Sequence, residues 1–395
     1  MASQEKFLLA ANIALYLFLA VFSFSYVDLN LTLSQNPLIL GFVSTMQQLG
    51  YFARPVATVI YIAFLTTAFS FFIYNLWLFK KEQVGLSYLK KSTIINTLIL
   101  IFAYPFLSYD FFNYLFDAKI ILNYHQIPYT VRPLDFPNDE WLRFMHWTHR
   151  YSPYGPLWLG MSIIPALFGF GKFILNFFAF KIFIASFHLV NSFLIYRILQ
   201  KLNPSQAIFQ TAFYSLNPLF LIEGIANAHN DIVLTAFILL SIYFLVFAKT
   251  GFTYIALLAG TLIKYIPVLN MPWFLLASFK VIGTDRVILA NFITFAIFTF
   301  VYSSIGINVP FVSSGATQIQ FQPWYLFWTL PLVALLPRFN LLIISLAIAL
   351  GASLRYLPYI YWGDWSHEGT IGFMQAITFL PAVLATIILA VKRTR

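Results

Sequence analysis

Residues 108–158 read SYDFFNYLFDAKIILNYHQIPYTVRPLDFPNDEWLRFMHWTHRYSPYGPLW and form the longest polar interruption in an otherwise hydrophobic chain. This stretch holds five of the thirteen acidic residues: Asp110, Asp117, Asp135, Asp139 and Glu140. The sequence on either side consists mainly of apolar runs that approach the ~20 residues a helix needs to cross a bilayer. The alternation predicts an all-α polytopic membrane protein in which residues 108–158 form a large loop on one membrane face.

The composition narrows the class of protein further. Hydrophobic residues make up 61% of the chain and charged residues 9%, whereas a soluble domain carries about 25% charged residues. Cysteine is absent, which excludes a disulfide framework and a thiolate metal site. The net charge of +10 comes from basic residues in short loops between the apolar runs, as the positive-inside bias requires. Nucleic-acid binding is therefore not expected, although a basic chain can suggest it.

The basic loops also orient the chain in the membrane. A short loop at residues 80–91 carries four lysines and therefore belongs on the cytoplasmic side. The next apolar run, residues 92–107, then leads outward and delivers Asp110 to the outer surface. Applied to the whole chain, the same rule predicts about twelve spans, with both termini in the cytoplasm and the loop 108–158 outside.

We expect one integral membrane domain over residues 1–395. Residues 1–91 would hold two N-terminal spans, residues 92–305 a core that includes the large loop, and residues 306–395 the C-terminal spans and outer loops. Residues 155–171 are apolar but short and bounded by glycines, so they either span the bilayer or only dip into its outer leaflet.

Two acids in the large loop share one face of a predicted helix. Asp110 and Asp117 are seven residues apart, which is about two helical turns. Asp110 follows directly on a span, where partial desolvation raises the pKa of a carboxyl toward the range of a general base. For Asp117 the simpler interpretation is an acid that solvates the loop, and a role beside Asp110 stays open.

Several other polar residues stand at span boundaries. Lys264 and Arg355 adjoin apolar runs and could hold a phosphate, although snorkelling of the charge to the interface also explains Lys264. His229 and Asn230 precede a span, where Asn230 or Asp231 could simply cap a helix. His146 and His149 have a metal-ligand spacing, but two histidines without a third ligand are a weak signal, and we expect no metal.

Four segments, taken in order, resemble glycosyltransferases of the GT-C superfamily. The loop that starts SYDFFNYLFDAKI and runs through IPY to SPYGPLW is similar to their first outer loop. The segments YSLNPLFLIEGIANAHND, LAGTLIKYIP and QPWYLFWTLPL are similar to polyprenyl-phosphate-mannose-dependent α-mannosyltransferases. The resemblance covers roughly residues 92–340 and implies a GT-C-like bundle in which the large outer loop, with amphipathic interfacial helices, is catalytic.

The resemblance implies an inverting transfer of a hexose, with mannose as the sugar, to a glycolipid or glycan acceptor. The donor is a polyprenyl-phosphate sugar that enters from the bilayer, and no metal or other cofactor is needed. Asp110 matches the catalytic base. The residues that the resemblance and the span boundaries mark for substrate binding are Asp117, Tyr154, Glu223, His229, Asn230, Lys264 and Arg355.

Two other functions compete with this hypothesis. A lipid-linked sugar transporter or flippase would need polar residues along a path through the bilayer. Lys181 and His188 lie well inside an apolar run, but they form no chain to the inner face. A polysaccharide polymerase or ligase would share the lipid-linked substrate, and the sequence leaves that alternative open.

Overall fold

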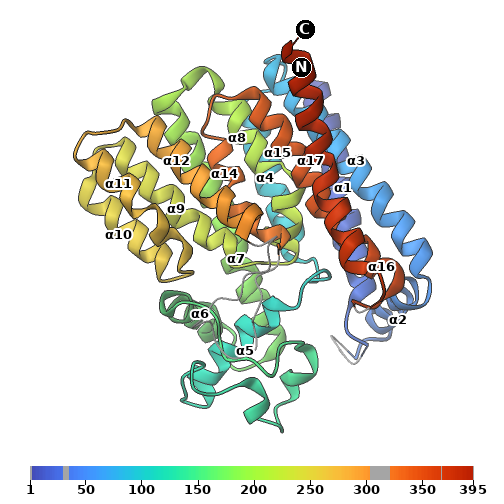
Figure 1. Cartoon of the computed structure of the whole chain (residues 1–395). Helices are drawn as coiled ribbons and strands as arrows, with labels where there is room; N and C mark the ends of the chain where they lie inside the picture. Colours follow the sequence, from blue (N-terminus) through green and yellow to red (C-terminus); the bar gives the residue numbers. More distant parts are fainter. Residues whose placement is uncertain (1, 30–34, 303–320, 366, 395) are drawn as a thin grey trace. The chain divides into compact units, whose positions relative to one another are not determined.

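The computed structural model describes residues 2–29, 35–302, 321–365 and 367–394 (Figure 1). Within these residues the secondary structure is helical and includes no strand. The predicted all-α class is therefore confirmed for the part of the chain that the structure describes. The chain divides into two compact units that are interleaved in sequence.

Unit one comprises Met1–Leu107, Asn203–Ala226 and Pro337–Arg395. Its α-helices are α1 (Ala2–Ser23), α2 (Pro37–Gln47), α3 (Arg54–Lys80), α4 (Leu86–Ile101), α8 (Ala207–Ser215), α15 (Phe339–Leu354), α16 (Leu357–Trp362) and α17 (Thr370–Thr394). Helix α15 packs along α17, α1 packs on α4, and α3 contacts α8, α15 and α16. The buried Tyr61 hydroxyl of α3 donates a hydrogen bond to the Ser353 carbonyl of α15 (3.0 Å).

Unit two comprises Ser108–Leu202 and Asn227–Leu336. Its α-helices are α5 (Asp110–Asn123), α6 (Pro156–Phe168), α7 (Phe173–Leu202), α9 (Asp231–Val246), α10 (Thr250–Thr261), α11 (Met271–Ser278), α12 (Thr284–Ala296) and α14 (Leu330–Val333). Helix α9 packs against α7, α10 and the 3-10 turn η9 (Pro323–Trp328). Helix α5 packs on α6 and α7, and this places the first residues of the large loop against the helical core of the unit.

Short 3-10 and π-helical turns complete the described secondary structure. In unit one they are η1 (Phe24–Tyr26), η2 (Gln48–Phe52), η5 (Pro204–Gln206) and η6 (Phe220–Ala226). In unit two they are η3 (Pro133–Asp135), η4 (Glu140–Phe144), η7 (Ile266–Asn270), η8 (Ile297–Tyr302) and η9.

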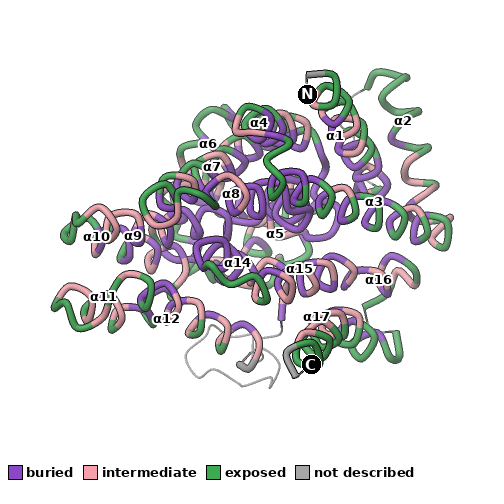
Figure 2. Tube along the Cα trace, turned by 90° about the horizontal axis from the view of Figure 1, so that it is seen from above, coloured by how far each residue is buried: buried purple, intermediate pink, exposed green. Residues whose placement is uncertain are grey.

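In the part of the chain that the structure describes, five helical segments are long and apolar enough to cross a membrane. They are Ser3–Tyr26, Arg54–Lys80, Phe173–Leu202, Phe339–Trp362 and Thr370–Lys392. A sixth results if Phe220–Ala226 and Asp231–Val246 count as one broken span. Much of the surface of α17 is exposed (Figure 2) and carries large apolar side chains such as Ile371, Phe373 and Leu380. Such a surface is typical of a helix that faces lipid, so the membrane class is supported by both sequence and structure.

About twelve spans are not confirmed among the described residues. Helix α10 has 12 residues and α6 has 13, which at 1.5 Å per residue gives roughly 18–20 Å against a hydrocarbon core of ~30 Å. The apolar run over residues 207–222 is interrupted, because α8 ends at Ser215 and a π-helical turn begins only at Phe220. The apolar runs at residues 56–79 and 173–196 instead form the long helices α3 and α7.

Candidate active site

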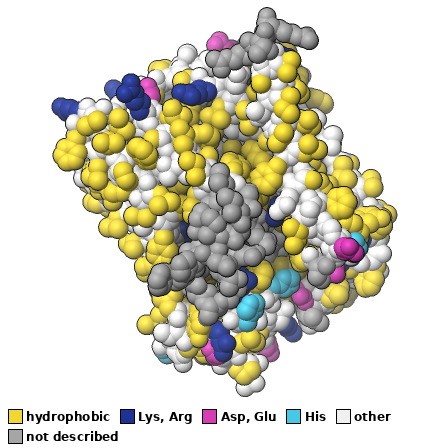
Figure 3. Space-filling view, viewed as in Figure 1, with side chains coloured by type: hydrophobic (Ala, Val, Ile, Leu, Met, Phe, Trp, Pro, Cys, Tyr) yellow, Lys and Arg dark blue, Asp and Glu magenta, His cyan; other side chains and the backbone are white. Residues whose placement is uncertain are grey.

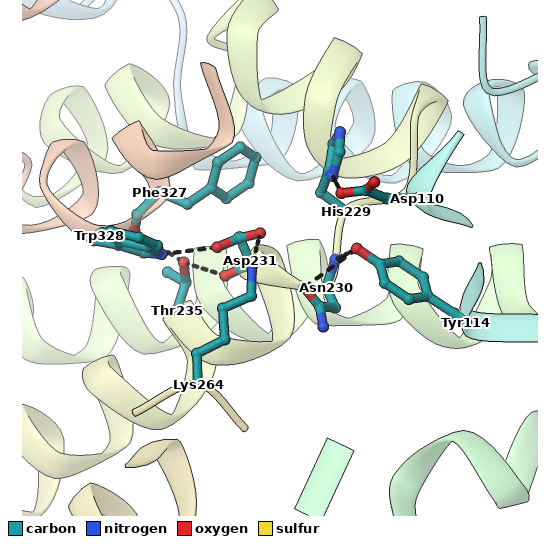
Figure 4. A network of polar contacts seen from close by, with 9 residues as sticks. All are labelled: Asp110, Tyr114, His229, Asn230, Asp231, Thr235, Lys264, Phe327 and Trp328. Carbon is teal, nitrogen blue, oxygen red and sulfur yellow. Dashed lines mark hydrogen bonds and ion pairs between the residues drawn. The ribbon is translucent and has the colours of Figure 1, made fainter. Parts of the chain in front are cut away.

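Asp110 is the first residue of α5 and lies within unit two. Its backbone N–H donates to the Ser108 hydroxyl (3.4 Å), which supports the start of the helix. The Asp110 side chain is 19% exposed, and its Oδ2 lies 3.8 Å from Nδ1 of the fully buried His229. The structure therefore brings together two predicted site residues that are far apart in the sequence (Figure 4).

The surroundings of Asp110 raise the pKa of its carboxyl above the usual aspartate range. Burial is the largest cause, because it disfavours the charged form, and the nearby Asp231 carboxylate adds to it. His229 and Lys264 act in the opposite direction, but they do not cancel the effect of burial. A carboxylate with a raised pKa holds a proton more firmly, which suits a general base.

The segment that carries His229 has an unusual backbone. Ala228 adopts a left-handed conformation with φ +57° although it is fully buried. Non-glycine residues rarely adopt this conformation, and such strain often accompanies functional sites. The turn directs the chain into α9, where Asn230 occupies the N-cap position without a side-chain capping hydrogen bond.

Asn230 instead contacts Tyr114 of α5. The Tyr114 hydroxyl donates to Asn230 Oδ1 (3.3 Å), and the Asn230 backbone N–H lies 3.4 Å from the same hydroxyl oxygen. Asn230 therefore stands at the N-cap position of α9, but its side chain does not make the capping hydrogen bond. Its side chain links the start of α9 to the helix that begins with Asp110 (Figure 4).

Asp231 joins the site, although the sequence did not single it out as a substrate-binding residue. Its carboxylate is fully buried and accepts from Lys264 Nζ at Oδ2 (2.6 Å) and from Trp328 Nε1 at Oδ1 (2.8 Å). Thr235 fixes the backbone around Asp231, because its hydroxyl donates hydrogen bonds to the carbonyl oxygens of Asp231 (2.8 Å) and Phe327 (3.0 Å). Lys264, the predicted phosphate ligand, is 19% exposed and has its ammonium fixed by this buried acid.

Aromatic rings surround these polar groups. The His229 ring stacks on Trp324 with centroids 3.8 Å apart, and Trp328 stacks on Tyr325 at 4.4 Å. Lys264 Nζ lies 5.9 Å from the centroid of the Tyr154 ring, a cation–π distance. The predicted site residue Tyr154 thus lies beside the predicted site residue Lys264. Trp324 and Trp328 come from the QPWYLFW segment, which could have indicated a site because its aromatics are so dense.

Lys264 is also positioned through the backbone. The N–H groups of Gly155 and Leu157 donate to the carbonyls of Ile263 and Leu262, each at 2.9 Å. A Cβ at position 155 would lie 2.2 Å from the Leu262 carbonyl oxygen, so only glycine allows this approach. These contacts join the end of the large loop to the turn that carries the lysine.

Replacing Gly155 by alanine is expected to separate the two segments and to displace Lys264. The overlap should cost about 1–3 kcal/mol of folding stability, and sugar transfer should fall with it. Gly160→Ala in α6 is a matched control, because a Cβ added at Gly160 would meet no atom within 4 Å. Thermal unfolding and transfer assays on both variants test this, and equal behaviour of the two would contradict it.

Comparison with known protein families identifies the family of this chain. A family model described as "Alpha-(1->6)-mannopyranosyltransferase, N-terminal domain" matches residues 13–280, which is more than half of the chain. The chain belongs to this family. It is an α-mannosyltransferase of the GT-C type, as the resemblance implied. No curated protein and no solved structure matches the chain.

The matched residues of the mannosyltransferase include most of the polar groups of the site. Asp110, His229, Asp231 and Lys264 all fall between residues 13 and 280. Trp324 and Trp328 lie beyond the match, and they enter the site through η9, which packs against α9. The candidate site of the mannosyltransferase thus includes aromatic residues from the C-terminal side of the matched region.

Asp117 of the mannosyltransferase is buried two turns after Asp110 and interacts with Ser152. Burial raises the pKa of its carboxyl to about 7. Asp139, another loop acid, instead forms an ion pair with Lys119 (2.6 Å) and accepts a hydrogen bond from Tyr124 (2.6 Å). The acids of the large loop therefore do not all serve to solvate it, because Asp117 and Asp139 make contacts inside the protein.

The raised pKa of Asp117 predicts a pH-dependent stability. Its folded-state pKa of about 7 exceeds the unfolded value of 3.8, so its protonated form contributes stability at low pH that is lost as pH rises through about 7. The side chain of the Asp117→Asn variant cannot ionise. The free energy of unfolding of this variant should therefore rise relative to that of wild type between pH 4 and pH 8, by about 4 kcal/mol at most. Thermal unfolding across this range, with the exposed Glu140→Gln as control, checks the difference. A difference that does not change with pH would contradict it.

Two predicted substrate-binding residues of the mannosyltransferase lie in unit one. Glu223 is fully buried in η6 and interacts electrostatically with Tyr61 and Tyr356. Arg355 donates to the Thr378 hydroxyl (3.4 Å). These contacts do not test their proposed roles, which stay predictions.

Each of the two histidines with metal-ligand spacing lies against an aromatic ring. The His146 ring stacks on Tyr109 with centroids 3.6 Å apart, and His149 lies edge-on to Trp147 at 6.3 Å. Among the described residues there is no group of three or more His, Asp or Glu side chains placed to hold a metal ion. Histidine and acidic side chains do gather where α5 and the following loop lie (Figure 3).

Proposed function

We propose that this mannosyltransferase takes mannose from a polyprenyl-phosphate-linked donor and transfers it, with inversion, to a lipid-linked or surface glycan on the extracytoplasmic face. The observation that carries the proposal is the arrangement of Asp110 and Lys264 in one unit. The Asp110 carboxylate, with its raised pKa, and the Lys264 ammonium, held by the buried Asp231, both border one region that is lined by aromatic side chains. These are the groups that sugar transfer from a phosphate leaving group requires.

In the proposed reaction Asp110 removes the proton from an acceptor hydroxyl. The hydroxyl oxygen attacks the anomeric carbon of mannose, and the bond from that carbon to the phosphate oxygen breaks. The lipid phosphate leaves with the bonding electrons, and one displacement inverts the configuration at the anomeric carbon. Lys264 stabilises the leaving phosphate, because an ammonium has three donors and only one is directed at Asp231.

The remaining residues of the site would hold the sugar. His229 and Trp324 form a stacked pair whose ring edges offer hydrogen bonds and apolar contact. Asn230 is fixed by Tyr114, and Tyr154 lies beside Lys264. We propose these groups as the sugar-binding surface.

The proposed sidedness follows from the charge distribution. The four lysines at residues 80–91 favour a cytoplasmic position for that loop, and the loop 108–158 would then lie outside. The same bias over the whole chain would put both termini in the cytoplasm. Nucleotide sugars are cytoplasmic, so an enzyme with an outer active site needs a donor carried by a lipid. The apolar helices would let such a donor approach within the bilayer.

The test compares donors with purified enzyme in lipid nanodiscs. Polyprenyl-phosphate mannose, polyprenyl-phosphate glucose and GDP-mannose are offered separately with a membrane glycolipid extract as acceptor, each with and without a chelator. The proposal expects transfer from the polyprenyl-phosphate mannose alone, at a rate the chelator leaves unchanged. Transfer from GDP-mannose would overturn the lipid donor. Movement of the lipid phosphate across liposomes without transfer would instead support the flippase.

A further inference from the structure

A cavity of about 230 Å³ lies on the far side of α5, between α5, α6 and the start of α7. Its polar lining consists of Lys119, Asn123, Trp141 and Asn176, and its apolar lining includes Leu167 and Phe170. We call it the Trp141 pocket. All of these residues belong to unit two.

The Trp141 pocket is separate from the proposed reaction site. Successive residues of an α-helix are 100° apart, so Lys119 lies about 180° around α5 from Asp110. Asp117, by contrast, shares the face of Asp110. One helix therefore presents two faces with different chemistry: Asp110 on one side and the Trp141 pocket on the other.

The two charged side chains at the polar side of the pocket, Lys119 and Asp139, neutralise each other. Lys119 Nζ pairs with Asp139 (2.6 Å) and lies 4.0 Å from the centroid of the Trp141 ring. Asp139 also accepts from the Tyr124 hydroxyl (2.6 Å) and from the Trp141 backbone N–H (2.8 Å). Burial alone would raise the pKa of Asp139, but these bonds hold it below the usual range. The acid therefore stays charged at neutral pH, and it balances Lys119.

The turn between α6 and α7, beside the pocket, has an uncommon backbone conformation. Phe170 and Gly171 both adopt left-handed backbone conformations, with φ +48° and +69°. The buried Asn176 side chain packs directly on Gly169, where a Cβ would lie 2.2 Å from its amide carbon. A large exposed residue in a left-handed conformation costs free energy, so this turn holds Phe170 at the pocket rim at a cost. Phe170 is 77% exposed.

We propose that the Trp141 pocket binds the neutral hexose headgroup of a glycolipid, apart from the transfer site. The amides of Asn123 and Asn176 and the Lys119–Asp139 pair offer donors and acceptors for sugar hydroxyls. The apolar rim at Leu167 and Phe170 fits the first carbons of a lipid chain. An anionic headgroup fits less well, because Asp139 already neutralises the one cation of the pocket lining.

The proposal is tested by photo-crosslinking of the full-length enzyme in nanodiscs. The probe is an octyl α-mannoside with a diazirine in its chain, and mass spectrometry locates the adducts. Adducts on residues 166–171 are expected, and unlabelled octyl mannoside should compete at least about tenfold better than methyl mannoside. Adducts elsewhere only, or equal competition by the two sugars, would overturn the glycolipid assignment. Stronger competition by phosphatidylglycerol than by octyl mannoside would do the same.

Three variants keep the outcome decisive. Ala166→Phe fills the cavity and should remove the adducts, and the exposed Asn123→Leu should weaken competition about tenfold without a risk to folding. Asp110→Asn should keep the adducts, because it alters only the opposite face of α5. Binding is measured without a donor, so failure of this proposal and failure of the proposed function are distinguishable. Unchanged labelling in both pocket variants would contradict the proposal.

Discussion

Replacing Asp110 by asparagine is expected to lower kcat for mannose transfer by about 10²–10⁴-fold, the usual contribution of a general base. Asparagine keeps the size of the side chain but cannot accept a proton from the acceptor hydroxyl. Donor affinity should change little, because the proposed phosphate contact comes from Lys264. In wild type, transfer should decline as pH falls through the raised pKa of Asp110, since only the ionised carboxylate acts as a base.

The control for Asp110→Asn is Asp117→Asn on the same helical face. Asp117 interacts with Ser152 and has no step in the proposed reaction, so this variant should keep most of the activity. Both variants must show cooperative thermal unfolding, so that a loss of transfer is not a loss of folding. Near-normal transfer by Asp110→Asn, or a greater loss in Asp117→Asn, would assign the base elsewhere.

Replacing Lys264 by methionine should cause the largest loss of stability. The change leaves the fully buried Asp231 carboxylate without its cation, and breaking a buried pair in this way costs about 3–5 kcal/mol. Transfer should also fall, because the leaving phosphate loses its ammonium contact. The exposed Lys249→Met is the control, and its stability should stay within about 0.5 kcal/mol of wild type.

The double variant Lys264→Met/Asp231→Asn separates the two effects. Removing the buried charge should restore much of the stability, because an amide needs no cation and can still bond Trp328. Transfer should stay low, because the ammonium is still absent. Thermal unfolding and donor kinetics on the three variants check this. Recovery of transfer together with stability would show that Lys264 is only structural.

Several site residues could be predicted from the sequence because they are polar groups next to apolar runs. Asp110, His229, Asn230 and Lys264 were identified in this way, whereas Tyr154 came from the family resemblance. The structure gathers all five residues in unit two. The physical signal is the cost of placing a charged or polar group near lipid without a purpose.

The contacts of Asp231 could not be predicted from the sequence. Next to a span start, its carboxylate had a simpler explanation as a helix cap, and its partners are far away in the sequence. Lys264, which follows α10, and Trp328 of η9 reach it only because α10 and η9 both pack against α9. A pairing of this kind depends on tertiary structure, and no local pattern reveals it.

The number of spans was the weakest part of the fold prediction. Apolar composition alone does not separate a full span from a short helix, as α10 with 12 residues and α11 with 8 residues show. Long uninterrupted runs such as those of α3 and α7 were predicted well, since they have no internal break. Proline and π-helical turns divide the later segments.

The configuration of the product tests the central claim most directly. The β and α anomers of polyprenyl-phosphate mannose are each incubated with wild-type enzyme, and the new linkage is assigned by NMR. A single displacement assisted by Asp110 predicts that only the β anomer is consumed and that the product is α-linked. An α-linked product from the α anomer would contradict the account, because retention requires two displacements and therefore a nucleophile instead of a base.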